Sequence, residues 1–200
     1  MPSTVTNLEK RTILDLVTAA GAGRACLIEE PLAAALGAGL DIRRPMGTMV
    51  VDIGGGTADI AVVTMGSISI SKSVKIAGNI LDEDIIRYLR RERNIVIGEK
   101  TAESIKKRIG CAYLRDTELA IGIKGKHYIT GMPITDEVNT TEVYLAMREH
   151  LEAIAEGVRS VLEVTPPELA GDISETGILL TGGGALLDGM DKLIEKRTGV

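Results

Sequence analysis

The residues best suited to chemistry lie in one short stretch, where Asp52 precedes Gly54, Gly55 and Gly56, and Thr57 follows them. A glycine in a folded segment costs roughly 0.5–1 kcal/mol relative to alanine, so a run of glycines favours a specific reason, such as close approach of the backbone to a ligand. Successive glycine N–H groups can bind phosphate oxygens. Asp52 would repel a phosphate unless a Mg²⁺ ion lay between them. The stretch therefore predicts either a metal–nucleotide site or a glycine-rich hairpin with a solvated carboxylate.

Two other stretches could contribute to such a site. Glu29 and Glu30 precede Pro31 at the start of a helix of small residues, although acidic residues are common there because the helix dipole stabilises them. Gly182 to Gly184 follow an apolar strand and precede a helical pattern. Such a turn can present backbone N–H groups to a nucleotide, but the pattern is weak evidence by itself.

The elements that must position these residues alternate between strands and helices, which indicates an α/β fold. Apolar, β-branched runs on both sides of the glycines predict a hairpin, and a third antiparallel strand follows it. A smaller lobe is predicted to be inserted at about residues 78–139. The expected strands are 25–28, 48–53, 58–63, 67–76, 118–123, 127–130 and 178–181, and the expected helices are 6–20, 31–39, 80–93, 100–109, 140–164 and 185–197.

Several classes of protein and site are disfavoured. The chain has no Gly-x-x-x-x-Gly-Lys-Ser/Thr loop, and its first glycine run leads into a strand rather than a helix, unlike a dinucleotide fingerprint. A net charge of −5 and 2% aromatic residues argue against nucleic-acid binding. Cys26 and Cys111 have no spacing typical of a metal site, and His127 and His150 have no clustered partner. Because no membrane-length apolar run or signal peptide is evident, a cytoplasmic protein is expected.

Five strings of residues resemble the MreB/Mbl family of bacterial actin homologues, within the actin-like ATPase superfamily. They cover residues 27–35, 49–57, 102–106, 166–170 and 180–186. The resemblance implies a ribonuclease H-like lobe with a smaller inserted subdomain. Members of the family begin earlier, with a phosphate-1 loop, and continue further, so the chain is expected to be their C-terminal half. Residues 1–47 would end the first lobe and include the connecting helix, 48–77 and 140–200 would form the nucleotide-binding subdomain, and 78–139 the insertion.

The resemblance also implies roles for the residues around the phosphates of ATP. Asp52 would hold Mg²⁺ through water, and Gly54, Gly55 and Gly56 would cradle the β- and γ-phosphates. Thr57 would contact the γ-phosphate and the attacking water.

By the same resemblance, Glu30 would orient that water for in-line attack. Glu103 would bind the ribose hydroxyls, and Lys106 would lie along the nucleoside. The adenine and α-phosphate would be admitted by the small residues Gly182, Gly183, Gly184 and Ala185.

The function that the resemblance implies is an ATP-dependent cytoskeletal filament that maintains rod cell shape by guiding cell-wall synthesis, with slow hydrolysis coupled to polymerisation. The expected partners are other copies of the protein and, at full length, the inner membrane and the elongation machinery. ATPase activity is expected of full-length members, whereas the 200 residues without a phosphate-1 loop are expected to be soluble and to bind ATP weakly or not at all. The alternatives are half of a sugar or acetate kinase, a chaperone ATPase domain, or a nucleotide-binding remnant that forms no polymer.

Overall fold

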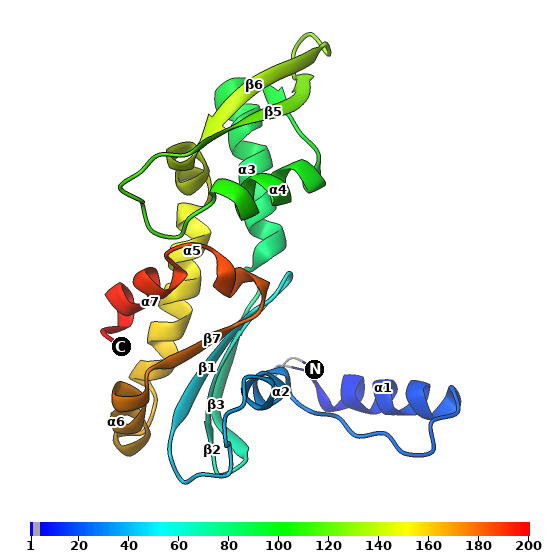
Figure 1. The fold of residues 1–200 in the computed structure, drawn as a ribbon. Helices are drawn as coiled ribbons and strands as arrows, with labels where there is room; N and C mark the ends of the chain where they lie inside the picture. The colour runs from blue at the N-terminus through cyan, green and yellow to red at the C-terminus, as the bar shows by residue number, and fades with distance from the viewer. Residues whose placement is uncertain (2–4) are drawn as a thin grey trace.

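The computed structural model describes residue 1 and residues 5–200. Its larger sheet has the strand order β3-β2-β1-β7, with β1 parallel to β7 and antiparallel to β2 (Figure 1). The strands are β1 (Thr48–Ile53), β2 (Ala58–Thr64), β3 (Ser67–Val74) and β7 (Ile178–Thr181).

Both faces of this sheet are covered, which explains why β1 and β2 are almost continuously apolar. Met49, Val51 and Ile53 face the main core, which includes helix α5 (Thr140–Glu163). Val50 packs on the other face in a small cluster with helix α2 (Glu30–Gly37). The glycine-rich turn between β1 and β2 is thus held by two buried strands.

A second sheet, of order β4-β5-β6, lies at the far end of the molecule with helices α3 and α4 against it (Figure 1). Its elements are α3 (Gly78–Arg93), β4 (Ile95–Val96), α4 (Glu99–Ile109), β5 (Ala120–His127) and β6 (Pro133–Asn139). Buried residues from both sheets belong to the main hydrophobic cluster. The cluster is continuous because α3 and α5 pack on each other between the sheets.

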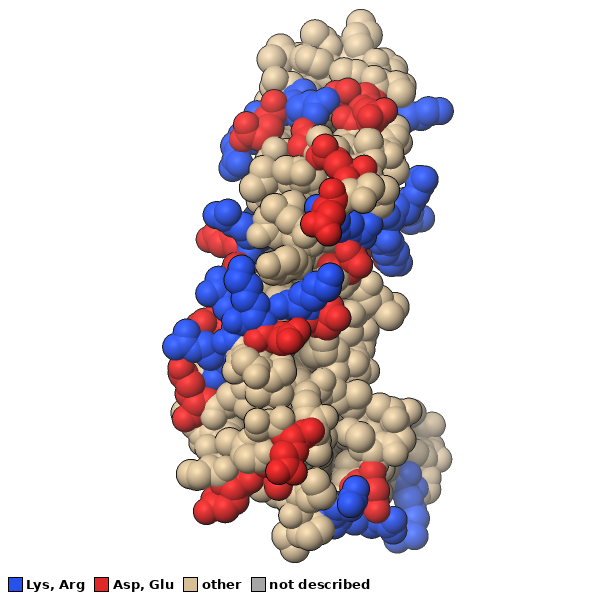
Figure 2. All heavy atoms as spheres, turned by 60° about the vertical axis from the view of Figure 1, so that its left-hand side comes forward, with Lys and Arg blue, Asp and Glu red and all other residues tan. Residues whose placement is uncertain are grey.

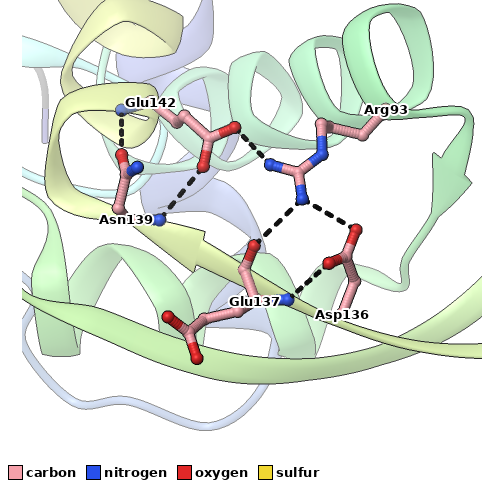
Figure 3. Close-up of polar contacts among 5 residues, drawn as sticks. All are labelled: Arg93, Asp136, Glu137, Asn139 and Glu142. Atoms are coloured by element: carbon pink, nitrogen blue, oxygen red, sulfur yellow. Dashed lines mark hydrogen bonds and ion pairs between the residues drawn. The ribbon is translucent and has the colours of Figure 1, made fainter.

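Helix α5 begins at the predicted capping box, in which Asn139 and Glu142 satisfy each other's backbone N–H groups. The same Glu142 accepts a hydrogen bond of 2.6 Å from Arg93, the last residue of α3. Arg93 also donates to Asp136 at 2.8 Å and to the Glu137 carbonyl at 3.3 Å (Figure 3). One guanidinium therefore joins the end of α3, strand β6 and the start of α5.

The N-terminal helix α1 (Asn7–Ala19) begins at the predicted capping box of Thr6 and Glu9, yet it buries no residue. It projects sideways from the rest of the molecule (Figure 1). Leu8 and Leu16 on it are 76% and 65% exposed.

One predicted strand, at 25–28, and one predicted hairpin, with its turn at 124–126, were wrong. Residues 25–28 form no strand, because they pair with no neighbouring strand among the described residues, and Ile28 is 47% exposed. The predicted turn at 124–126 lies inside β5, and the chain reverses at 128–132 instead. Gly125 is required by close packing, since a Cβ there would lie 2.6 Å from the Val96 carbonyl oxygen.

The C-terminal helices also differ from the prediction. Pro166 and Pro167 follow α5 as predicted, but they also begin a helix that was not predicted. Pro167 is the first residue of this helix, α6 (Pro167–Thr176). The helix expected over 185–197 is divided into a 3₁₀ turn, η1 (Gly183–Leu186), and α7 (Met190–Thr198). The glycines after β7 thus belong to a tight turn rather than to a helix start.

The charged side chains do not separate by sign on the face drawn in Figure 2, where acidic and basic groups are interleaved along the molecule. In the part of the chain that the structure describes, no helix is both long and apolar enough to cross a bilayer.

Candidate functional site

The two glycine turns meet at one edge of the larger sheet. Strands β1 and β7 are parallel neighbours, and Asp52 is in register with Thr181. Both strands end there, so Gly54 to Gly56 and Gly182 to Gly184 leave the sheet side by side. Ligands of α/β proteins commonly bind beyond the carboxyl ends of parallel strands.

The first turn is closed by a hydrogen bond of 2.9 Å from the Gly54 N–H to the Thr57 carbonyl. None of its three glycines has a positive φ. A Cβ at Gly55 would lie 3.2 Å from the Asn79 side chain, whereas one at Gly56 would meet nothing within 4 Å. Because the fold leaves room for a side chain at Gly56, the bare backbone there is consistent with the approach of a ligand.

The second turn is packed more tightly. Gly182 has a φ of +83°, and a Cβ there would lie 2.5 Å from Asp52 Oδ1. A Cβ at Gly184 would collide with the Ile53 side chain, but one at Gly183 would meet nothing within 4 Å. Gly182 and Gly184 thus allow the two turns to touch, and Gly183 faces open space.

Two carboxylates lie behind the first turn. Asp52 is in register with Asp59 across the hairpin, so both side chains are on one face of the sheet. Asp59 is 1% exposed; its Oδ2 accepts 2.8 Å from the Thr57 hydroxyl, and its Oδ1 has no partner. Burial, with the charges of Glu30 and Asp59, raises the pKa of Asp52. The sequence analysis missed Asp59, although an acidic residue inside an apolar strand was a signal that could have identified it.

This arrangement fits a divalent cation. A buried carboxylate oxygen without a partner is costly, and a cation near Asp52 and Asp59 would satisfy both groups. Within residue 1 and residues 5–200, no group of three or more His, Cys, Asp or Glu side chains is arranged to hold a metal. The other ligands would be phosphate oxygens and water, which is usual for Mg²⁺.

A cleft of about 830 Å³ lies between the glycine turns and helices α3 and α4. Its volume is within the range of small-molecule sites. Six of the predicted site residues line it, namely Gly54, Gly55, Glu103, Lys106, Gly183 and Gly184. The other predicted residues are not in its lining, namely Glu30, Asp52, Gly56, Thr57, Gly182 and Ala185.

The two predicted α4 residues differ in surroundings. The Glu103 side chain is 48% exposed and pairs at 2.6 Å with Lys107, which lowers the pKa of Glu103. The Lys106 side chain is only 14% exposed, and its ammonium lies 2.9 Å from Asp82 and 2.7 Å from the Gly78 carbonyl oxygen.

Glu30 is the first residue of α2, and its side chain is 41% exposed. It lies 3.7 Å from the amino group of Met1 and near enough to Asp52 to help raise the pKa of that carboxyl. The Thr57 hydroxyl donates to Asp59, which is the register partner of Asp52. Ala185 lies in the 3₁₀ turn η1.

Comparison with known proteins identifies similar chains. A family model described as MreB/Mbl protein matches residues 1–200. The chain is 46% identical over 200 residues to the cell shape-determining protein MreB of Escherichia coli, and 45% identical over 193 residues to the cell shape-determining protein Mbl of Bacillus subtilis. These alignments cover 100% and 96% of the chain, and 58% of each relative.

Among solved structures, MreB 5 of Spiroplasma citri bound to AMPPNP has a TM-score of 0.95 and 41% identity, covering 100% of this chain and 60% of that one. The chain thus spans less than two thirds of the relatives it matches. The expected α/β actin-like fold is confirmed. By its full-length match to the family model and its identity to these relatives, the chain belongs to the MreB/Mbl family.

Proposed function

We propose that this chain is the nucleotide-binding part of an actin-like filament protein that maintains rod cell shape by guiding cell-wall synthesis. The observation that supports this most directly is the meeting of two glycine turns at one sheet edge beside a cleft. A similar protein with 41% identity is bound to AMPPNP, an ATP analogue. Slow ATP hydrolysis coupled to polymerisation would time the life of the filament.

In this proposal the phosphates lie over the first turn. The Gly54 N–H closes the turn on the Thr57 carbonyl, and the N–H groups of Gly55 and Gly56 bind the β- and γ-phosphate oxygens without a charged side chain. Asp52 would hold Mg²⁺ through water, and the neighbouring Asp59 carboxylate would add negative charge beside the ion. When bound, the ion neutralises part of the phosphate charge.

Hydrolysis needs mainly a positioned water, because phosphoryl transfer depends on alignment and charge neutralisation. Glu30 accepts a hydrogen bond from the attacking water and orients the water for in-line attack. The Thr57 hydroxyl donates to Asp59, so its lone pairs remain free to accept a hydrogen bond from the same water.

The nucleoside would occupy the cleft beside α4. Glu103 accepts hydrogen bonds from the ribose hydroxyls, and the methylene stem of Lys106 lies along the nucleoside. Adenine and the α-phosphate lie against residues with almost no side chain, namely Gly182, Gly183, Gly184 and Ala185.

We also propose a domain division. Residues 78–139, which contain the second sheet, form a subdomain inserted between 48–77 and 140–200, and residues 1–47 belong to the end of a first lobe with its connecting helix. The main partner would be a second copy of the protein. At full length the filaments would lie in the cytoplasm on the inner membrane, with the elongation machinery.

Sedimentation and phosphate-release assays on the protein at its full natural length test this function. We expect Mg-ATP to promote pelleting and to be hydrolysed slowly, with ADP pelleting less. Transfer of phosphate to any member of a sugar panel would favour a kinase, and Mg-ATP binding without pelleting would indicate a nucleotide-binding protein that forms no filament.

A further inference from the structure

The wall of the cleft contains an ion pair whose role the nucleotide site does not explain. The Lys106 ammonium on α4 lies 2.9 Å from the Asp82 carboxylate on α3, and both side chains are only 14% exposed. Both residues line the cleft. The pair therefore joins the two helices where they border the ligand.

The same ammonium is linked to the first glycine turn. It donates 2.7 Å to the Gly78 carbonyl oxygen at the start of α3. The Gly78 N–H donates 3.1 Å to the Gly54 carbonyl, and the Asn79 N–H donates 2.8 Å to the Gly55 carbonyl. Lys106 thus bonds Gly78, the residue whose own N–H bonds the turn.

The pair is costly to build, which argues that its position matters. An ammonium has three donors, and two of those of Lys106 are in use. Asp82 Oδ1 is buried without a partner, and burial is the main cause that raises the pKa of Asp82. Removing one partner of a poorly solvated pair leaves the other uncompensated, so each residue depends on the other.

We propose that Asp82 and Lys106 are a positioning pair that holds the first turn of α3, and through it Gly54 and Gly55, in the geometry that binds the β- and γ-phosphates. This inference rests on the proposed nucleotide function. The ammonium of Lys106 acts on the turn and makes no bond to the nucleotide, although its stem borders the nucleoside.

The test uses Asp82→Asn and Lys106→Met in the protein at its full natural length. Asp82→Asn keeps the shape of the side chain, and Lys106→Met keeps most of the apolar stem but removes the ammonium. Calorimetric titration with Mg-ATP and with AMP separates the roles, because AMP has no β- or γ-phosphate. We expect each variant to weaken Mg-ATP binding by about tenfold and AMP binding by less than about twofold. The double variant is expected to be no weaker than either single one.

The control is Arg197→Met, which breaks another pair between helices, with Glu152 at 2.6 Å; Arg197 does not line the cleft. We expect wild-type affinity for it. Equal loss of AMP and Mg-ATP affinity in Lys106→Met would mean that the ammonium binds the nucleoside side, and unchanged Mg-ATP affinity in Asp82→Asn would also overturn the pair's role.

Hydrogen exchange of the Asn79 amide in the ligand-free protein tests the pair independently of the function. We expect faster exchange in Asp82→Asn and Lys106→Met and wild-type exchange in Arg197→Met. Unchanged exchange in both would reject the positioning role. Failure of the wild-type protein to bind Mg-ATP, with exchange altered as expected, would reject only the proposed function.

Discussion

At the scale of single residues, the glycines of the two turns serve different purposes. Gly182 and Gly184 touch the end of β1, where a side chain would collide with Ile53. Gly56 and Gly183 have open space and no positive φ, so packing does not require glycine there. We therefore attribute Gly182 and Gly184 to packing of the fold, and Gly56 and Gly183 to the approach of a ligand.

Gly183→Ala is predicted to leave the fold intact and to weaken nucleotide binding. Its methyl group meets no protein atom within 4 Å, and loss of chain flexibility in the unfolded state adds about 0.4–1 kcal/mol of stability. Calorimetry should show Mg-ATP affinity lowered by about tenfold, because the methyl group enters the cleft. Gly182→Ala is the contrasting variant, since it should lower the melting temperature. Wild-type affinity in Gly183→Ala would argue against a nucleotide at this turn.

Glu30→Ala is predicted to slow ATP hydrolysis by about 100-fold or more while changing Mg-ATP affinity by less than about twofold. The reason is that Glu30 would hold the water and touch no phosphate. Single-turnover phosphate release and equilibrium titration measure the two effects separately. Parallel loss of binding and hydrolysis would contradict the role assigned to Glu30.

Asp52→Asn is predicted to stabilise the ligand-free fold at neutral pH. The folded-state pKa of Asp52 is raised, chiefly by burial, so the native state holds the proton more tightly than the unfolded state does. The free energy of unfolding therefore falls as pH rises from the ordinary carboxyl pKa through the raised one. Denaturant unfolding should show a gain for Asp52→Asn that shrinks as pH falls toward 3.8, the ordinary value.

The same variant should lose the Mg²⁺ dependence of ATP binding, because an amide is a poorer ligand than a carboxylate for this ion. A metal-dependent affinity that survives in Asp52→Asn would place the ion elsewhere.

The sequence predicted the first glycine turn and its strands, but Asp59 was missed. Its role depends on register across the hairpin, which brings it opposite Asp52, and on complete burial. An acidic residue inside an apolar strand marks the position, but its register and its burial are seen only in the folded structure. The surroundings of Lys106 were equally hidden, because Gly78 and Asp82 are on another helix.

At the scale of elements, strong local signals were reliable. The capping boxes at Thr6 and Asn139 start α1 and α5 as predicted. The strand expected at 25–28 was wrong because an apolar run needs a neighbour to become a strand. The turn expected at Gly125 was wrong because close approach to β4 explains that glycine equally well.

Arg93→Met is predicted to lower the free energy of unfolding by about 1–3 kcal/mol. Arg93 is 33% exposed at its side chain and pairs with Asp136 and Glu142, which are 33% and 17% exposed. Removal of the guanidinium leaves both carboxylates without their cation. The resulting loss of stability is therefore expected to exceed the loss from breaking an exposed surface pair. Arg91→Met, which breaks an exposed pair with Glu92, should change stability by less than about 0.5 kcal/mol. Equal stability of the two variants would show that the Arg93 contacts contribute little.

At the scale of the whole molecule, the described chain has one main core, a small cluster between α2 and the larger sheet, and one helix, α1, outside both. The core joins both sheets, whereas α1 buries no residue. The order of elements predicted that residues 78–139 form a distinct unit, but it could not show that this unit shares its core with the larger sheet through α3 and α5.

Leu16→Ala in the 200-residue chain is predicted to shift the thermal midpoint of the core by less than about 1 °C, because Leu16 is 65% exposed and its helix contains no buried residue. Leu151→Ala removes a side chain that is 1% exposed and should cost about 2–5 kcal/mol. Tertiary circular dichroism measures both. A large effect of Leu16→Ala would reveal a packing role for α1.

The pairing of β1 with β7 has a consequence for synthesis of the protein. The strands that end in the two glycine turns are neighbours in the sheet, yet residues 54–177 are made between them. Contacts between residues so distant in sequence form slowly, and a nascent chain has no second turn until β7 has left the ribosome. A nucleotide held by both turns therefore cannot assist the early steps of folding, and the β1–β2 hairpin must form without it.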